Sequence, residues 1–155
     1  MFETVVVATD GSESVRRAVD VAADLAARFG ATVHALSVVD TDEVDGAPES
    51  VREDLKQALT ENAAEAAAAV DDRVAGGVET QVVEGRPAPE IVSHARAVDA
   101  DVVAMGTRGR HGENRFLVGS VAERVVRTCP VPVLTVRQLD ASTAEDGEQD
   151  GDVAS

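Results

Sequence analysis

The sequence of 155 residues contains no tryptophan, no tyrosine and a single cysteine, Cys129. Without tryptophan and tyrosine, the chain has few aromatic platforms on which nucleic-acid bases could stack. One cysteine forms no internal disulfide, and no positively charged, apolar segment precedes the first expected strand, so we expect a reducing, cytoplasmic location. No apolar run approaches the roughly 18 residues of a membrane span, so no membrane partner is expected.

Basic residues are also scarce. The chain has 14 Lys and Arg residues against 29 Asp and Glu residues, a formal net charge of −15, and Lys56 is the only lysine. Nucleic-acid binding requires clustered basic side chains, and this balance argues against it. Acidic residues spread over the whole chain favour a halophilic, salt-adapted protein, because carboxylates keep a surface hydrated and salt screens their mutual repulsion. A merely acidic protein is the alternative.

What the sequence does contain is an alternation of two hydrophobic patterns. We expect strands over 3–9, 31–39, 78–83, 101–105 and 131–136, and helices over 13–29, 49–75, 87 to about 98, and about 120–128. The Asp, Glu, Gly and Pro residues of 40–48 are typical of a loop. Strands that alternate with helices predict an α/β fold with a parallel sheet, right-handed crossovers and helices on both faces.

The chain changes character after Arg137. From Asp140 to Ser155 there are six acidic residues, no basic residue and almost nothing apolar to bury. We therefore predict one domain over 1–137 and an acidic disordered tail over 138–155.

The segment with the clearest chemistry is 106–120, which reads GTRGRHGENRFLVGS. It joins a strand-like run to a helix-like run, and this arrangement presents backbone N–H groups to an anion. Three arginines against one glutamate make the segment locally positive, and Ser120 adds a hydroxyl at the helix entry. An ordinary glycine-rich loop with solvated arginines is the alternative. The segment matches neither the Walker pattern nor GxGxxG.

Other polar residues give weaker signals. Asp10 follows the first strand, where its carboxylate could either cap the next helix or contact a ligand. We expect His34 and His94 to be structural or solvent-facing, and His111 is a weak candidate for phosphate binding. The histidines show neither metal-ligand spacing nor a nucleophile–base pair.

Three segments are informative together: the pattern Gly106-x2-Gly109-x9-Gly119-Ser120, the strand ending ATDGS at 8–12, and CPVPVLTV at 129–136. In combination they resemble the universal stress protein family. The resemblance implies a Rossmann-like three-layer sandwich whose five-stranded parallel sheet has the order 3-2-1-4-5. It also implies homodimers through the last strand, Val131 to Val136, and ATP, possibly with Mg²⁺, between strands one and four.

The resemblance also implies roles for individual residues. Asp10 would contact the adenine or ribose, and Val38 and Val39 would line the adenine. Contacts with the ribose and phosphates would come from Met105, Gly106, Gly109, Gly119, Ser120 and Val121. Arg108 is added to the candidate site because of its charge alone.

We therefore expect an ATP-binding universal stress protein, a nucleotide-dependent stress-response or regulatory dimer without fast turnover. No general base or metal–carboxylate pair is visible in the sequence, so it is at most a slow ATPase. The alternatives are a nucleotide hydrolase or adenylyl-transferring enzyme of the same fold, and a nucleotide-free adaptor dimer.

Salt adaptation predicts that stability depends on ionic strength. Raising KCl from about 0.1 M to about 1 M shortens the Debye length roughly threefold, so the unfolding midpoint should rise as repulsion among carboxylates is screened. Thermal unfolding followed by circular dichroism checks this. A midpoint indifferent to KCl would count against salt adaptation.

Overall fold

The computed structural model of the chain describes residues 2–107 and 119–137. Within these residues lies one five-stranded sheet, with every strand parallel to its neighbours, in the order β3-β2-β1-β4-β5. The strands are β1 (Thr4–Ala8), β2 (Thr32–Asp40), β3 (Val78–Gly85), β4 (Val102–Gly106) and β5 (Val133–Val136). This confirms the predicted α/β fold class and strand order. The predicted tail over 138–155 lies outside the described residues.

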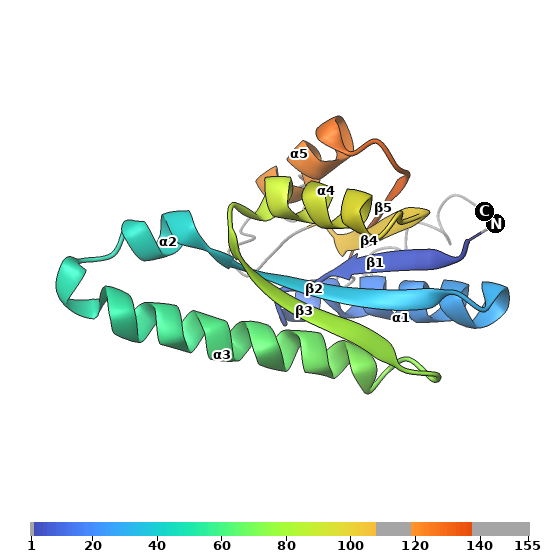
Figure 1. Cartoon of the computed structure of the whole chain (residues 1–155), viewed down its shortest axis with the longest axis horizontal. Helices are drawn as coiled ribbons and strands as arrows, with labels where there is room; N and C mark the ends of the chain where they lie inside the picture. Colours follow the sequence, from blue (N-terminus) through green and yellow to red (C-terminus); the bar gives the residue numbers. More distant parts are fainter. Residues whose placement is uncertain (1, 108–118, 138–155) are drawn as a thin grey trace, which may run out of the picture.

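Helices cover both faces of the sheet (Figure 1). α1 (Glu13–Phe29) and α3 (Arg52–Asp71) pack on one face, and α4 (Pro87–Ala97) and α5 (Ser120–Thr128) pack on the other. Val5 and Val7 of β1 belong to the first apolar layer, while Val6 and Ala8 belong to the second. Because successive strand residues point to opposite faces, a strand covered on both sides is apolar at every position.

Two predicted boundaries were wrong. The segment expected as a loop contains a short helix, α2 (Thr41–Asp45), which begins where the Asp40 carboxylate accepts a hydrogen bond from the Asp42 N–H at 2.9 Å. Aspartate is common both in loops and at helix N-caps, so composition did not separate the two. The helix expected over 49–75 instead starts with a 3₁₀ turn, η1 (Glu49–Val51), and α3 ends at Asp71, whose carboxylate accepts the Val78 N–H at 3.0 Å.

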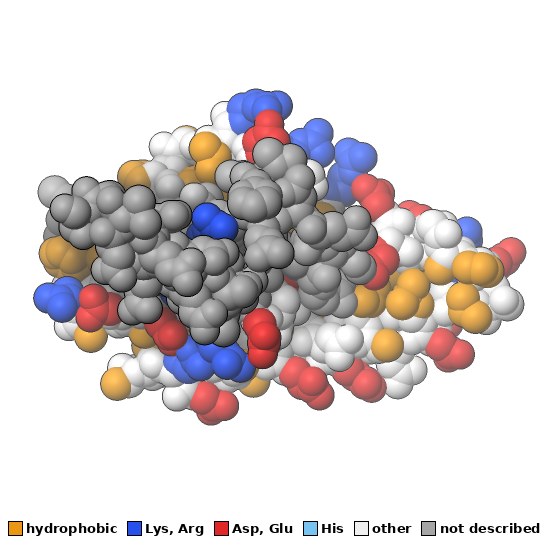
Figure 2. Space-filling view, turned by 180° about the vertical axis from the view of Figure 1, so that it is seen from behind, with side chains coloured by type: hydrophobic (Ala, Val, Ile, Leu, Met, Phe, Trp, Pro, Cys, Tyr) orange, Lys and Arg blue, Asp and Glu red, His pale blue; other side chains and the backbone are white. Residues whose placement is uncertain are grey.

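The acidic side chains are spread over the face of the molecule shown in Figure 2 rather than gathered in one patch. In the part of the chain that the structure describes, no helix has the length and apolar character needed to cross a membrane.

Asp101 fastens the start of β4 to the start of β1. Its carboxylate accepts the Glu3 N–H at 2.7 Å and the Thr4 N–H at 3.0 Å, and its own N–H donates to the Thr4 carbonyl at 2.9 Å. The hydrogen bonds from the Glu3 and Thr4 N–H groups lower the pKa of Asp101 below its usual value of 3.8. The ionised carboxylate is thus the form that the fold stabilises.

Replacing this carboxylate should therefore give a pH-dependent loss of stability. Because the pKa of Asp101 is depressed on folding, its contribution is fully present above pH 3.8 and is lost as the pH falls through the folded-state pKa. We expect Asp101→Asn to lower the urea midpoint at about pH 7, and the difference from wild type to shrink towards about pH 3.

The matched control is Asp99→Asn. Asp99 is exposed and has a positive φ of 52°, which asparagine adopts as readily as aspartate. This control should leave the urea midpoint nearly unchanged. Equal midpoints for Asp101→Asn and wild type at neutral pH would contradict the role given to Asp101.

Candidate functional site

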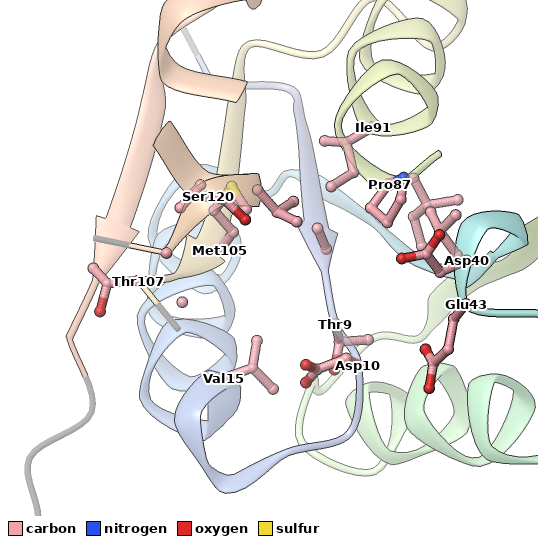
Figure 3. Close-up of a pocket in the computed structure, with 17 residues that line it drawn as sticks. Thr9, Asp10, Val15, Asp40, Glu43, Pro87, Ile91, Met105, Thr107 and Ser120 are labelled. Atoms are coloured by element: carbon pink, nitrogen blue, oxygen red, sulfur yellow. The ribbon is translucent and has the colours of Figure 1, made fainter. Parts of the chain in front are cut away.

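A cavity of about 340 Å³ opens at the carboxyl ends of β1, β2 and β4 (Figure 3). The order of the strands reverses between β1 and β4: from β1 the chain adds β2 and β3 on one side, and it then adds β4 and β5 on the other side of β1. Ligands commonly bind at such a point. The volume of the cavity lies in the range of about 300–1,000 Å³ that is typical of small-molecule sites. The walls come from β1, β2, β4 and the N-terminal turns of α1, α2, α4 and α5.

One end of the cavity is formed by the start of α5. Gly119, Ser120, Val121 and Ala122 all line it. The first backbone bond of this helix runs from the Glu123 N–H to the Gly119 carbonyl at 2.9 Å, so the N–H groups of the preceding turn have no partner within the helix. Together with the helix dipole, these groups make this end of the cavity attractive to an anion.

The end of β4 is joined to the start of α5. The Gly119 N–H donates to the Thr107 carbonyl, and Thr107 itself donates to the Val136 carbonyl at 3.3 Å. Figure 3 shows Thr107, Met105 and Ser120 on the same side of the cavity. The strand, the helix start and the edge strand β5 therefore hold the anion-attracting end in place.

The middle of the cavity is apolar. Its lining includes Leu36 and Val38 from β2, Ile91 from α4 and Met105 from β4. Leu36 is fully buried, and Ile91 and Met105 are 3% and 5% exposed, so this surface is largely withdrawn from water. Such a surface suits a flat apolar group such as a nucleobase.

Carboxylates border the cavity away from α5. Asp10 lies at the end of β1, and Asp40 and Glu43 lie at the start of α2, opposite Ser120 in Figure 3. The Asp10 Oδ1 accepts the Ser12 N–H at 2.9 Å, and no hydrogen bond from the Ser12 side chain caps α1. Asp10 therefore shapes the turn into α1 and borders the cavity at the same time.

The turn after Asp10 requires glycine. Gly11 has a φ of +78°, and a Cβ at this position would lie 3.1 Å from the Cβ of Ala66 on α3. Both the backbone conformation and the close approach of α3 disfavour a larger residue. The loop that carries Asp10 is thus held against α3.

Seven of the predicted site residues meet around this cavity: Asp10, Val38, Met105, Gly106, Gly119, Ser120 and Val121. Val39 is not part of its lining. It is 2% exposed and packs with Leu59 and Ala63 of α3, because it points to the opposite face of β2 from Val38. Arg108 and Gly109 lie outside the described residues.

Several lining residues were not predicted. Thr107 directly follows β4 and Asp40 is the last residue of β2, so the rule that ligands lie at the carboxyl ends of parallel strands could have found them. Glu43, Pro87 and Ile91 reach the cavity only because α2 and α4 pack beside it, and the sequence carried no signal for that.

The carboxylates around the cavity do not make a metal centre by themselves. In the described residues, no group of three or more His, Cys, Asp or Glu side chains is arranged to hold a metal ion. A metal ion in this cavity would therefore need further ligands from whatever molecule binds there.

Comparisons with known proteins find relatives over most of the chain. The sequence profile of the Universal stress protein family matches residues 1–137. A universal stress protein of Methanocaldococcus jannaschii is 37% identical over 142 residues, which cover 89% of this chain and 84% of that protein.

Two solved structures share the fold. The first comes from a structure-based assignment of the biochemical function of a hypothetical protein; its TM-score is 0.79, its sequence identity 28%, and the match covers 91% of this chain and 99% of that one. The second is a universal stress protein in complex with cAMP, with a TM-score of 0.61, 28% identity, and coverage of 89% of this chain and 98% of that one.

Proposed function

The chain belongs to the universal stress protein family, and from this premise we propose that it binds ATP in the cavity at the carboxyl ends of β1 and β4. The observation that carries the proposal is the start of α5, which lines a cavity of suitable size and whose first N–H groups have no partner within the helix. A structural neighbour in complex with cAMP supports an adenine nucleotide as the ligand.

The three parts of the cavity suggest how the nucleotide lies. The phosphates are placed at Gly119, Ser120 and Val121, where the helix start favours negative charge. The adenine is placed against the apolar surface that includes Val38, and the ribose hydroxyls lie near Asp10, whose carboxylate accepts hydrogen bonds. This orientation keeps the phosphates away from the carboxylates of α2.

Mg²⁺ fits this proposal as a companion of the nucleotide. Because the described residues hold no ready metal centre, phosphate oxygens and water would supply most of its ligands, as is usual for Mg²⁺.

We propose binding without fast turnover. Asp10 and Asp40 each use one carboxylate oxygen to accept a backbone N–H, which holds them as structural acceptors rather than as bases aimed at a water. Nucleotide occupancy would then act on contacts with a partner or a second copy in a stress response. A slow ATPase and a nucleotide-free adaptor remain the alternatives.

The proposal predicts that Gly119→Asp abolishes most nucleotide affinity. Aspartate is a good N-cap residue, so α5 should still form, but the new carboxylate would compete for the N–H groups and repel the phosphates. We expect micromolar-range binding of ATP by the wild type in calorimetric titration, and binding weaker by at least about tenfold in the variant.

Gly119→Asn is the matched control, because asparagine caps helices equally well and has the same shape without the charge. It should weaken binding less than Gly119→Asp. Absence of ATP binding by the wild type, or equal affinities for wild type and Gly119→Asp, would refute the proposal. Mass spectrometry of nucleotide that co-purifies with the protein separates the alternatives, since intact ATP, a turned-over product and nothing are distinct outcomes.

We further propose that the protein forms a homodimer through β5. This strand is at the edge of the sheet, and the Pro132 and Val136 carbonyls accept the N–H groups of Val103 in β4 and of Thr107 just after it. Because alternate residues of a strand direct their backbone groups to opposite sides, Val133 and Thr135 direct theirs to the open edge. An apolar edge strand of this kind is a site for pairing with another strand.

The dimer should depend on the outward N–H of Thr135. Thr135→Pro removes this donor and should convert the dimer to a monomer in light scattering coupled to gel filtration, whereas Thr135→Val keeps the donor and should remain dimeric. A chain ending at Asp140 should also remain dimeric. A dimeric Thr135→Pro variant, or a monomeric chain ending at Asp140, would contradict the pairing through β5.

A further inference from the structure

Two histidines meet in the layer between the sheet and α4. The ring of His34, on β2, and the ring of His94, on α4, lie edge to face with centroids 5.9 Å apart. His94 is 9% exposed, and in the described part of the chain its Nε2 has no hydrogen-bond partner. The His34 side chain is 15% exposed, and its Nδ1 lies 3.3 Å from a carboxylate oxygen of Glu79 on β3.

This contact belongs to the same layer as the cavity. His34 is level with Val6 of β1 in the sheet register, and Val6 is part of the apolar layer covered by α4 and α5. His94 follows Ile91 by one helical turn on the buried side of α4. Since Ile91 lines the cavity, a shift of α4 at His94 would displace the cavity wall.

We propose that the contact between His34 and His94 responds to pH, so that protonation of His94 loosens α4 from β2 and alters the wall of the cavity. The two rings touch across an interface, and a protonated His94 would place a positive charge beside the His34 ring. The charge on His94 would also lie among the apolar side chains of this layer, where no described partner receives its Nε2 proton.

The surrounding charges do not offset this cost. Glu79 pairs with His34 rather than His94, and its side chain is 71% exposed, which weakens its effect. On α4 itself, Glu90 lies one turn before His94, and its carboxylate is close to Gly85. The charged residues of α5, which also packs on α4, are exposed: Glu123, Arg124 and Arg127. β1 contributes apolar Val6 to this layer.

The sign of the pH dependence follows from the burial of His94. Burial, and secondly the proximity of His34, lower the pKa of His94 from its ordinary value of 6.5. A histidine with a depressed pKa contributes stability that is fully present above pH 6.5 and is lost as the pH falls towards the folded-state pKa. Across that window, each proton taken up on unfolding raises the unfolding equilibrium constant by up to about tenfold per pH unit.

The first experiment follows the histidine ring signals of the wild-type protein by NMR as the pH is lowered. We expect the His94 signal to titrate below pH 6.5, and amide exchange in α4, corrected for its intrinsic pH dependence, to accelerate with the same midpoint. A His94 signal that titrates at or above 6.5, or α4 amides whose exchange is independent of it, would overturn the proposal.

The second experiment compares variants by urea unfolding between about pH 7.5 and about pH 5.5. His94→Leu removes the buried titrating ring and should flatten the loss of stability over this range, while His34→Gln should raise the pKa of His94. His111→Gln is the matched control, because it removes a histidine outside the pair and should keep the wild-type slope. If His94→Leu lost stability with falling pH as steeply as the wild type, the proposal would be overturned. If His94→Leu does not fold, the NMR titration of the wild-type protein is the deciding test.

Discussion

The burial of β1 on all sides is the constraint on which the rest of the structure depends. Val5, Val6 and Val7 are fully buried, helices cover both faces, and β2 and β4 pair with both edges. A polar side chain has no place in the fully buried part of such a strand, so Thr4 lies at its start, and Thr9 and Asp10 follow it at its carboxyl end. The cavity forms there because α1, which follows β1, packs on one face of the sheet, whereas α5, which follows the neighbouring β4, packs on the other.

The charges of the cavity come from two different sources. The anion-attracting end is built from backbone N–H groups at the start of α5, whereas the carboxylates of Asp10, Asp40 and Glu43 border the cavity away from it. On a chain with a net charge of −15, backbone dipoles provide a local positive potential without adding basic side chains. The described part of the site therefore favours a ligand with its negative charge at one end.

α4 connects the cavity to the buried histidine contact. Its first turns supply Pro87 and Ile91 to the cavity, and its last turns carry His94 to the sheet. On the proposal made above, a shift of α4 at His94 would also move the part of the cavity wall that Ile91 supplies. The same helix would then be both a wall of the cavity and the element through which pH acts on it.

The sequence by itself determined the alternation of strands and helices, and the resemblance of its motifs supplied the strand order that the sheet shows. Periodicity identifies a helix or strand because apolar side chains recur wherever the element turns the same face to the core. On this basis α1 was predicted at its observed bounds, Glu13–Phe29. The resemblance also implied a site between strands one and four, and Asp10, Gly106 and the start of α5 do line one cavity there.

Only the tertiary structure decided which side chains face the cavity. Val38 and Val39 are indistinguishable in the sequence, yet the pleat of β2 directs the first to the cavity and the second to α3. Glu43 and Ile91 reach the cavity because α2 and α4 pack beside it. His94 contacts His34 although the two residues are 60 positions apart in the sequence. Such contacts depend on how whole elements pack, whereas the sequence pattern records only whether each residue is buried.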